Sequence, residues 1–151
     1  MRQVYRGLAS LVALLVVVQA MSMVLATAGF FHWIDEGNSA DHALLAADNP
    51  PEFTGSVGFM IHGISGTMVI PLVALLLLIA SFFAKVPRGI VLALVVVLLT
   101  VIQVFAGITA HDIPAVGLVH GLNAFLLFGA AVMAAKAARE AGAAPGPAAT
   151  A

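Results

Sequence analysis

Four apolar stretches, each long enough to cross a bilayer as a helix, dominate this chain: residues 8–31, 55–83, 89–110 and 113–135. A helix needs about 20 residues to cross a hydrocarbon core of ~30 Å. Helix is the expected form of all four, because it satisfies its own backbone hydrogen bonds in lipid. Of the 151 residues, 62% are hydrophobic and 9% are charged, a balance typical of membrane proteins. The sequence therefore predicts an all-α, membrane-embedded four-helix bundle over residues 1–140, with up-down-up-down topology.

The charged residues segregate between the connections. All six cations fall before the first span, between the second and third spans, or after the fourth: Arg2, Arg6, Lys85, Arg88, Lys136 and Arg139. Most of the acids fall in the other two connections: Asp35, Glu36, Asp41, Asp48, Glu52 and Asp112. By the positive-inside rule, we expect a multi-pass protein of a bacterial inner (plasma) membrane with both termini in the cytoplasm. The cations are spread over three segments, so they indicate topology in a lipid bilayer and predict no nucleic-acid partner.

The segments outside the spans are short or of low complexity. The outer loop, residues 32–54, is the only long connection, and residues 39–47 within it predict a short helix over the outer mouth of the bundle. The tail, residues 141–151, is rich in Ala, Gly and Pro and is expected to be disordered. The chain has no cysteine, which excludes disulfides, thiolate metal sites and covalently attached c-type heme.

Two histidines lie inside the second and fourth spans, and each precedes a glycine: His62-Gly63 and His120-Gly121. An ionisable side chain at membrane depth is costly and indicates a functional site. A rise of 1.5 Å per residue puts both rings about 10 Å below the outer ends of their spans. A glycine also lets a bulky, flat group approach the backbone beside each ring. We therefore predict that one heme b binds between these spans, with His62 and His120 as its iron ligands.

Other side chains are expected to complete this site. Gln103 lies at about the same depth in the third span and is expected to hydrogen-bond a histidine or the ligand. Gln19 and Asn123 are expected to form hydrogen bonds between helices. Apolar side chains predicted to line the macrocycle are Phe59, Met60, Phe105, Leu122 and Phe125. His32 and His111 lie at the outer surface, where they would contact heme propionates, transfer protons or serve only as solvated caps.

A simpler reading needs no cofactor. The two intramembrane histidines would then hydrogen-bond across helices, and the adjacent glycines would permit close helix packing. A zinc or iron site with carboxylate ligands is disfavoured, since no Asp or Glu lies within the spans.

A weak internal repeat runs through the four spans. Residues 16–19 in the first span resemble residues 100–103 in the third, and residues 61–63 in the second resemble residues 119–121 in the fourth. The chain thus reads as a duplicated helical hairpin. A pseudo-twofold axis between the hairpins would bring the second and fourth spans face to face, as a shared ligand requires.

These motifs are similar to those of a known family. Gln103-Val104-Phe105-Ala106-Gly107, followed by His111, Pro114 and Val119-His120-Gly121-Leu122-Asn123-Ala124, resembles a half-unit of the heme A synthase family. The resemblance implies a four-helix bundle whose second and fourth helices each supply a histidine to a b-type heme, here His62 and His120. The catalytic half of that family typically carries a glutamate where this chain has Phe59, and many members have a cysteine pair in the first outer loop.

The predicted function is that of a small b-type cytochrome, with one heme b per chain, in electron transfer or heme handling. We expect it to be non-catalytic, because an iron held by two histidines has no open position for oxygen. A homodimer or a respiratory redox protein of the membrane is the expected protein partner. The alternatives are a heme-free accessory or assembly subunit, and a heme-modifying enzyme that works as a homodimer.

Overall fold

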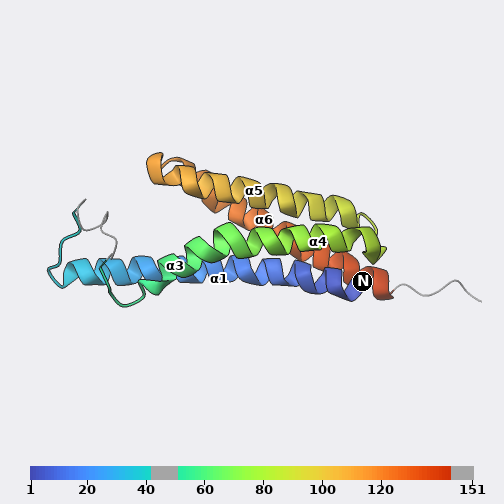
Figure 1. Ribbon diagram of the computed structural model, residues 1–151, viewed down its shortest axis with the longest axis horizontal. Helices are drawn as coiled ribbons and strands as arrows, with labels where there is room; N and C mark the ends of the chain where they lie inside the picture. Colours follow the sequence, from blue (N-terminus) through green and yellow to red (C-terminus); the bar gives the residue numbers. More distant parts are fainter. Residues whose placement is uncertain (42–50, 144–151) are drawn as a thin grey trace, which may run out of the picture.

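The computed structural model describes residues 1–41 and 51–143, and these residues form helices joined by short connections (Figure 1). The elements are α1 (Arg2–Asp35), α3 (Val57–Ile64), the π-helix η1 (Ser65–Val69), α4 (Ile70–Ala84), α5 (Gly89–Asp112) and α6 (Val116–Ala143). α3, η1 and α4 follow one another without a break, so the described residues include four helices long and apolar enough to cross a membrane. The predicted all-α four-helix bundle is confirmed. The chain is a multi-pass integral membrane protein.

Most of the helices are longer than the predicted spans. α1 begins and ends beyond the predicted 8–31, and α6 runs to Ala143, three residues into the predicted tail. Residues 144–151, the rest of that tail, lie outside the described residues. The predicted short helix at 39–47 also lies largely outside them, and its first residues, 39–41, are not helical.

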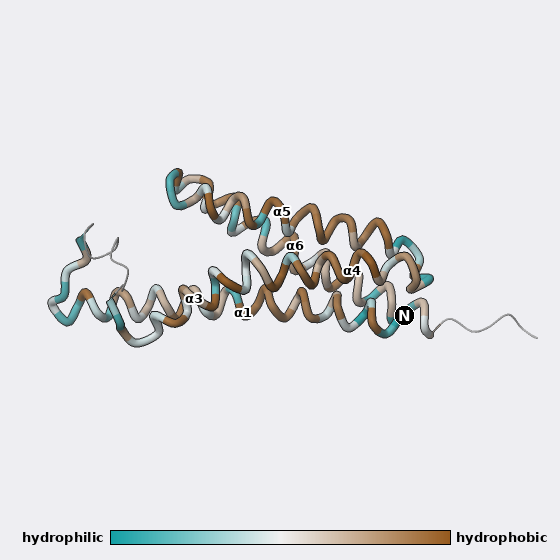
Figure 2. Tube along the Cα trace, in the orientation of Figure 1, coloured by the Kyte–Doolittle hydropathy of each residue, from teal (hydrophilic) through white to brown (hydrophobic). Residues whose placement is uncertain are grey.

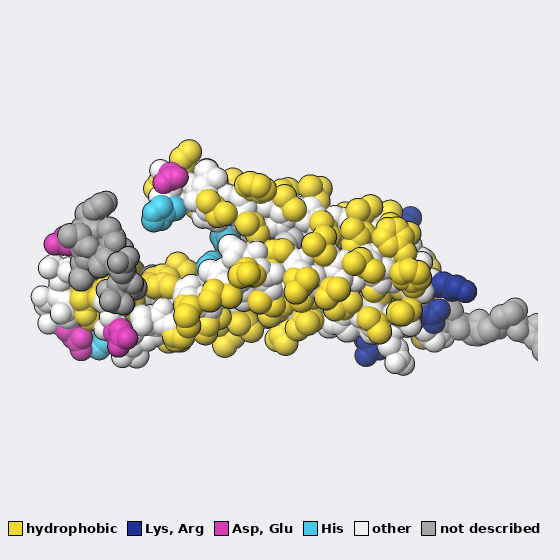
Figure 3. Space-filling model, viewed as in Figure 1, with side chains coloured by type: hydrophobic (Ala, Val, Ile, Leu, Met, Phe, Trp, Pro, Cys, Tyr) yellow, Lys and Arg dark blue, Asp and Glu magenta, His cyan; other side chains and the backbone are white. Residues whose placement is uncertain are grey.

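Polar and apolar residues are arranged along the bundle axis. Hydrophobic residues cover the middle of the helices, and hydrophilic residues gather at their ends (Figure 2). The start of α1 and the end of α6 lie at the same end of the bundle, where the Lys and Arg side chains also gather (Figures 1 and 3). We call this the basic end. The opposite end carries Asp35, Glu36, Glu52 and Asp112, and we call it the acidic end.

The tightly packed core lies toward the basic end. Alanines from all four long helices contribute to it, and small side chains of this kind let membrane helices approach closely. The largest fully buried side chains are Tyr5, Val12, Leu77, Val96 and Leu127. The Tyr5 hydroxyl donates to the carbonyl oxygen of Gly89 at 2.9 Å, which fixes α1 to the α4–α5 turn.

Toward the acidic end, the two helical hairpins separate. α3 packs on α1, whereas α5 and α6 stay together along their length. The space-filling view shows a hollow between these two pairs, with histidine side chains at its bottom (Figure 3). The packed half of the bundle thus supports an open half, and the candidate site lies where they meet.

Candidate functional site

His62 of α3 and His120 of α6 face each other across the hollow. Their ring centroids lie 6.0 Å apart, and the ring planes are inclined at 55°. Both side chains are half-buried. The structure therefore brings together two histidines that are 58 positions apart in the sequence (120 minus 62), on helices from different hairpins.

Each ring is fixed by a main-chain carbonyl of the preceding long helix. Nδ1 of His62 lies 3.1 Å from the carbonyl oxygen of Gln19 on α1. Nδ1 of His120 lies 3.0 Å from the carbonyl oxygen of Gln103 on α5. A carbonyl oxygen only accepts hydrogen bonds, so Nδ1 must be the donor in both contacts. In the neutral ring, the lone pair is then on Nε2, which leaves Nε2 as the metal-binding atom of each histidine.

The side chains of the two glutamines reinforce this arrangement. Gln103 Nε2 donates to the carbonyl oxygen of His120 at 3.0 Å. Asn123 Nδ2 in turn donates to Gln103 Oε1 at 2.6 Å and to the carbonyl oxygen of Leu99 at 2.8 Å. The predicted hydrogen bond of Gln103 to a histidine and the predicted interhelical bond of Asn123 correspond to these contacts, which join α5 to α6 at the level of His120.

The other hairpin has a matching network. Gln19 Nε2 donates to the hydroxyl of Ser65, and that hydroxyl donates to the carbonyl oxygen of Ile61 at 2.6 Å. Ser65 follows His62 by three positions, just as Asn123 follows His120. The sequence repeat therefore has a counterpart in three dimensions, with one glutamine, one histidine and one further polar side chain in each hairpin.

Two glycines allow the close approaches that build the site. A Cβ at Gly107 would lie 2.9 Å from Cε1 of His120, so the bare backbone of α5 lets the ring lie against it. A Cβ at Gly58 would lie 2.2 Å from the carbonyl oxygen of Ser22, so this glycine sets how closely α3 packs on α1. At Gly63 and Gly121, by contrast, no described atom beyond the adjoining backbone of the same helix and the two neighbouring residues lies within 4 Å of such a Cβ. The glycines next to the two histidines border open space.

The π-helix η1 determines which side of α3 carries His62. The N–H of Ile70 donates to the carbonyl oxygen of Ser65, five residues back, instead of four as in an α-helix. The extra residue turns α3 by about 100° relative to α4, compared with an uninterrupted α-helix. If the helix were an uninterrupted α-helix, Gly63 would lie at the position facing α1 that His62 occupies.

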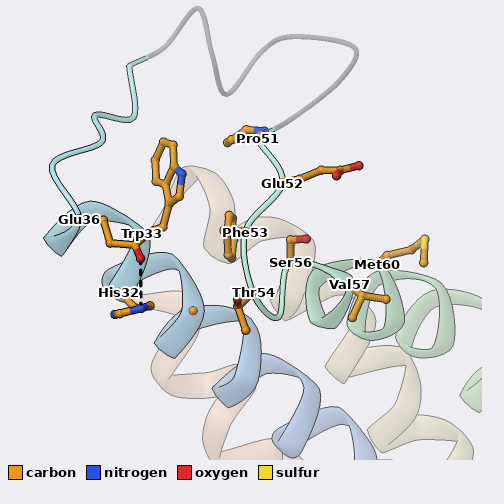
Figure 4. Close-up of a pocket in the computed structure, with 11 residues that line it drawn as sticks. His32, Trp33, Glu36, Pro51, Glu52, Phe53, Thr54, Ser56, Val57 and Met60 are labelled. Atoms are coloured by element: carbon orange, nitrogen blue, oxygen red, sulfur yellow. Dashed lines mark ion pairs between the residues drawn. The ribbon is translucent and has the colours of Figure 1, made fainter.

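Other residues proposed from the sequence lie away from the two rings. His32 lies in a separate pocket of about 970 Å³ at the acidic end, between the end of α1 and residues 51–60 (Figure 4). Its Nε2 is 3.4 Å from Oε1 of Glu36, with both side chains largely exposed. His111 is exposed at the end of α5.

The apolar residues predicted to line the macrocycle are on the surface of the single chain. Phe59 is 42% exposed and packs on Phe53, with ring centroids 6.2 Å apart. Met60, Phe105, Leu122 and Phe125 are more exposed still, up to 78% for Phe125. Alanines fill the packed interior, so these five side chains are not part of the core, and their contact with a macrocycle stays a prediction.

The two histidines fit a metal that brings most of its own ligands. Within residues 1–41 and 51–143, no group of three or more His, Asp or Glu side chains is arranged to hold a metal ion. An imidazole nitrogen binds a metal at about 2.0 Å, so two rings on opposite sides of one ion have centroids roughly 6 Å apart. The observed separation of 6.0 Å is close to that value, and two rings in direct contact also lie at such a distance. A heme iron, whose macrocycle supplies the remaining ligands, meets both conditions.

Comparison with known proteins gives no relative from which a function of the site could be inferred. No family model, no curated protein and no solved structure matches this chain. The resemblance to a half-unit of the heme A synthase family stays a prediction from short motifs.

Several residues of the site did not stand out in the sequence. Gln19 was expected only to bond between helices, and no role was assigned to Ser65 or to the glycine at 107. The repeat carried a usable signal, because Ser65 occupies the position relative to His62 that Asn123 occupies relative to His120. Hydropathy gives no such signal for η1, which lies inside one continuous apolar span.

Proposed function

We propose that this protein is a small membrane b-type cytochrome that binds one heme b between α3 and α6. Nε2 of His62 and Nε2 of His120 are the proposed axial ligands. One observation carries the proposal: two rings 6.0 Å apart, each with its Nδ1 bonded to a glutamine carbonyl and its Nε2 free of that bond. Histidines that ligate metals commonly donate their other ring nitrogen in this way.

The chain's own residues orient the ligands and control access to them. The Gln19 and Gln103 carbonyls fix the tautomer and plane of the two rings. The open space beside Gly63 and Gly121 leaves room for a flat group next to each ring. Bound heme would supply one-electron chemistry at its iron. With both axial positions held by the protein, electron transfer or heme handling is favoured over oxygen chemistry, and we propose no enzymatic activity.

The proposed location is a bacterial inner membrane, with the basic end on the cytoplasmic side. The gathering of the Lys and Arg side chains at the basic end supports this orientation. Reporter domains fused after residue 143 should then report cytoplasm, and reporters inserted near residue 49 should report the opposite side. A homodimer or a respiratory redox protein of the same membrane is the proposed protein partner.

The second candidate is a heme-free accessory subunit. The same hydrogen bonds favour it, because His62 and His120 each tie two helices together without any cofactor. The two candidates differ in whether heme is needed. The accessory subunit should fold and reach its normal level in the membrane without heme.

An absorption spectrum of the full chain, purified after expression with ample heme, tests the proposal. The cytochrome should show the Soret, α and β bands of six-coordinate low-spin heme and should bind carbon monoxide poorly, since both axial positions are filled. A folded, colourless protein that takes up no added hemin would reject the cytochrome in favour of the accessory subunit.

A further inference from the structure

A second pocket lies at the basic end, far from the histidines, between the start of α1 and the end of α6. Its volume is about 600 Å³, and Arg2, Arg6 and Arg139 are among the residues that line it. Two of these arginines come from the first turns of α1, and the third comes from the end of α6. The packing of α1 on α6 thus gathers cations that the sequence separates by more than 130 positions (139 minus 6 is 133).

These arginines lack partners in the described part of the chain. The ion pairs found there are His32–Glu36 and Lys136–Glu140, and neither includes an arginine of the pocket. Nε of Arg2 is buried without any hydrogen-bond partner. A buried donor left in this state destabilises the protein, and more so when it is charged. An anion in the pocket would remove that cost.

The chemistry and position of the pocket identify the class of anion. Guanidinium groups bind phosphate oxygens through pairs of hydrogen bonds, and several of them around one cavity favour a phosphate over a lone carboxylate. Apolar surface adjoins the pocket on α1, where Val4 is 51% exposed and Leu11 is 39% exposed. A phosphodiester that carries acyl chains satisfies both features. Basic pockets between membrane helices are known sites for anionic lipid head groups.

We propose that this pocket binds the head group of an anionic phospholipid, with Arg2 and Arg139 as its principal phosphate ligands. The inference does not depend on heme. Lys85 and Arg88 provide a matched control, because they are cations of the same end but do not line the pocket. If lipid binding depended on charge alone, removal of either pair of cations would weaken it equally. A built site loses affinity only when the pair that lines it is removed.

Native mass spectrometry of the detergent-purified full chain, titrated with phosphatidylglycerol or phosphatidylcholine, tests the proposal. Phosphatidylglycerol should bind the unchanged protein more tightly than phosphatidylcholine. Arg2→Gln with Arg139→Gln should weaken phosphatidylglycerol binding about tenfold, the equivalent of one lost charge-assisted contact. Lys85→Gln with Arg88→Gln should change it less than twofold, on the same scale.

Three results would overturn the proposal. One is equal affinity of the unchanged protein for the two lipids, a comparison that requires no variant to fold. Another is an equal loss of phosphatidylglycerol in the two double variants. The third concerns the source of the anion: if millimolar inorganic phosphate displaces phosphatidylglycerol, the pocket binds a soluble phosphate and not a lipid. Arg2→Lys with Arg139→Lys keeps the charge but loses the paired donors, and it should bind with intermediate affinity.

Discussion

Gly107 lies directly beneath the ring of His120, so closely that a Cβ at this position would be 2.9 Å from Cε1 of the ring. The ring therefore rests on the bare backbone of α5 while its Nδ1 bonds to the carbonyl oxygen of Gln103 at 3.0 Å. A single added methyl group must push the imidazole away from α5. The orientation of one proposed iron ligand thus depends on a glycine of the neighbouring helix.

Gly107→Ala should lower the heme content or change the ligand field without unfolding the protein, since the ring can move more easily than the backbone. The heme-to-protein ratio and the low-spin absorption bands are the measurements. Gly129→Ala on α6 is the control, because a Cβ there would meet no atom of the described structure within 4 Å. An unchanged spectrum in the Gly107 variant would show that this contact does not set the position of His120.

Gly63→Leu and Gly121→Leu should each reduce heme binding although neither side chain would meet protein at its Cβ. The physical reason is that the open space beside the two rings is the space proposed for the macrocycle. Hemin titration of the purified variants measures the effect, with Gly129→Leu as the matched control. Full heme affinity in both variants would mean that the macrocycle lies elsewhere.

Deletion of Met68 should remove the extra residue of η1 and restore a regular α-helix, in which Ser65 lies four residues before Ile70. His62 then keeps its side facing α1. Met68 is 67% exposed, so its side chain contributes little to packing. The deletion should therefore keep heme binding.

Deletion of both Met68 and Val69 is the contrasting variant. It removes one residue more than η1 adds, so α3 should turn by about 100° relative to α4, and Ile61 should take the place of His62 facing α1. Heme binding should be lost in this variant, as judged by the heme-to-protein ratio. Loss of heme in the single deletion although it folds, or full heme content in the double deletion, would contradict the role of the π-helix.

Tyr5→Phe should destabilise the bundle by about 1 kcal/mol, the usual net contribution of one hydrogen bond. The lost bond is the one from the Tyr5 hydroxyl to the carbonyl oxygen of Gly89. Tyr5→Ala should cost about 3 kcal/mol or more, because it also leaves a cavity in the core. Unfolding in mixed micelles measures both. Heme content per folded molecule should not change, and a selective loss of heme in Tyr5→Phe would link the two ends of the bundle in a way that the contacts do not predict.

The sequence predicted the parts of this structure that follow from hydropathy and helix geometry. Long apolar runs have one stable form in lipid, so the four-helix bundle was accessible from composition and length. Counting residues from the span ends placed His62 and His120 at one level, and the structure brings their rings together. The depth of Gln103 predicted its hydrogen bond to a histidine, whereas Gln19 was predicted only to hydrogen-bond between helices.

The remainder depends on tertiary packing. A π-helix adds one residue to a turn without changing the hydropathy of the span, so the facing of His62 could not be read from spacing. Gly58 and Gly107, which meet a neighbouring helix, look no different in sequence from Gly63 and Gly121, which do not. The convergence of Arg2 and Arg139 also required knowing that α1 packs on α6.

The heme-to-protein ratio and spin state of His62→Ala and His120→Ala test the central claim most directly. Each variant should lose most of its heme, or retain a high-spin form that binds carbon monoxide, because one axial position is then empty. His32→Ala and His111→Ala, which change histidines outside the facing pair, should keep low-spin heme at the ratio of the unchanged protein. If His62→Ala or His120→Ala retains full low-spin heme, these two rings are not the ligands of one iron.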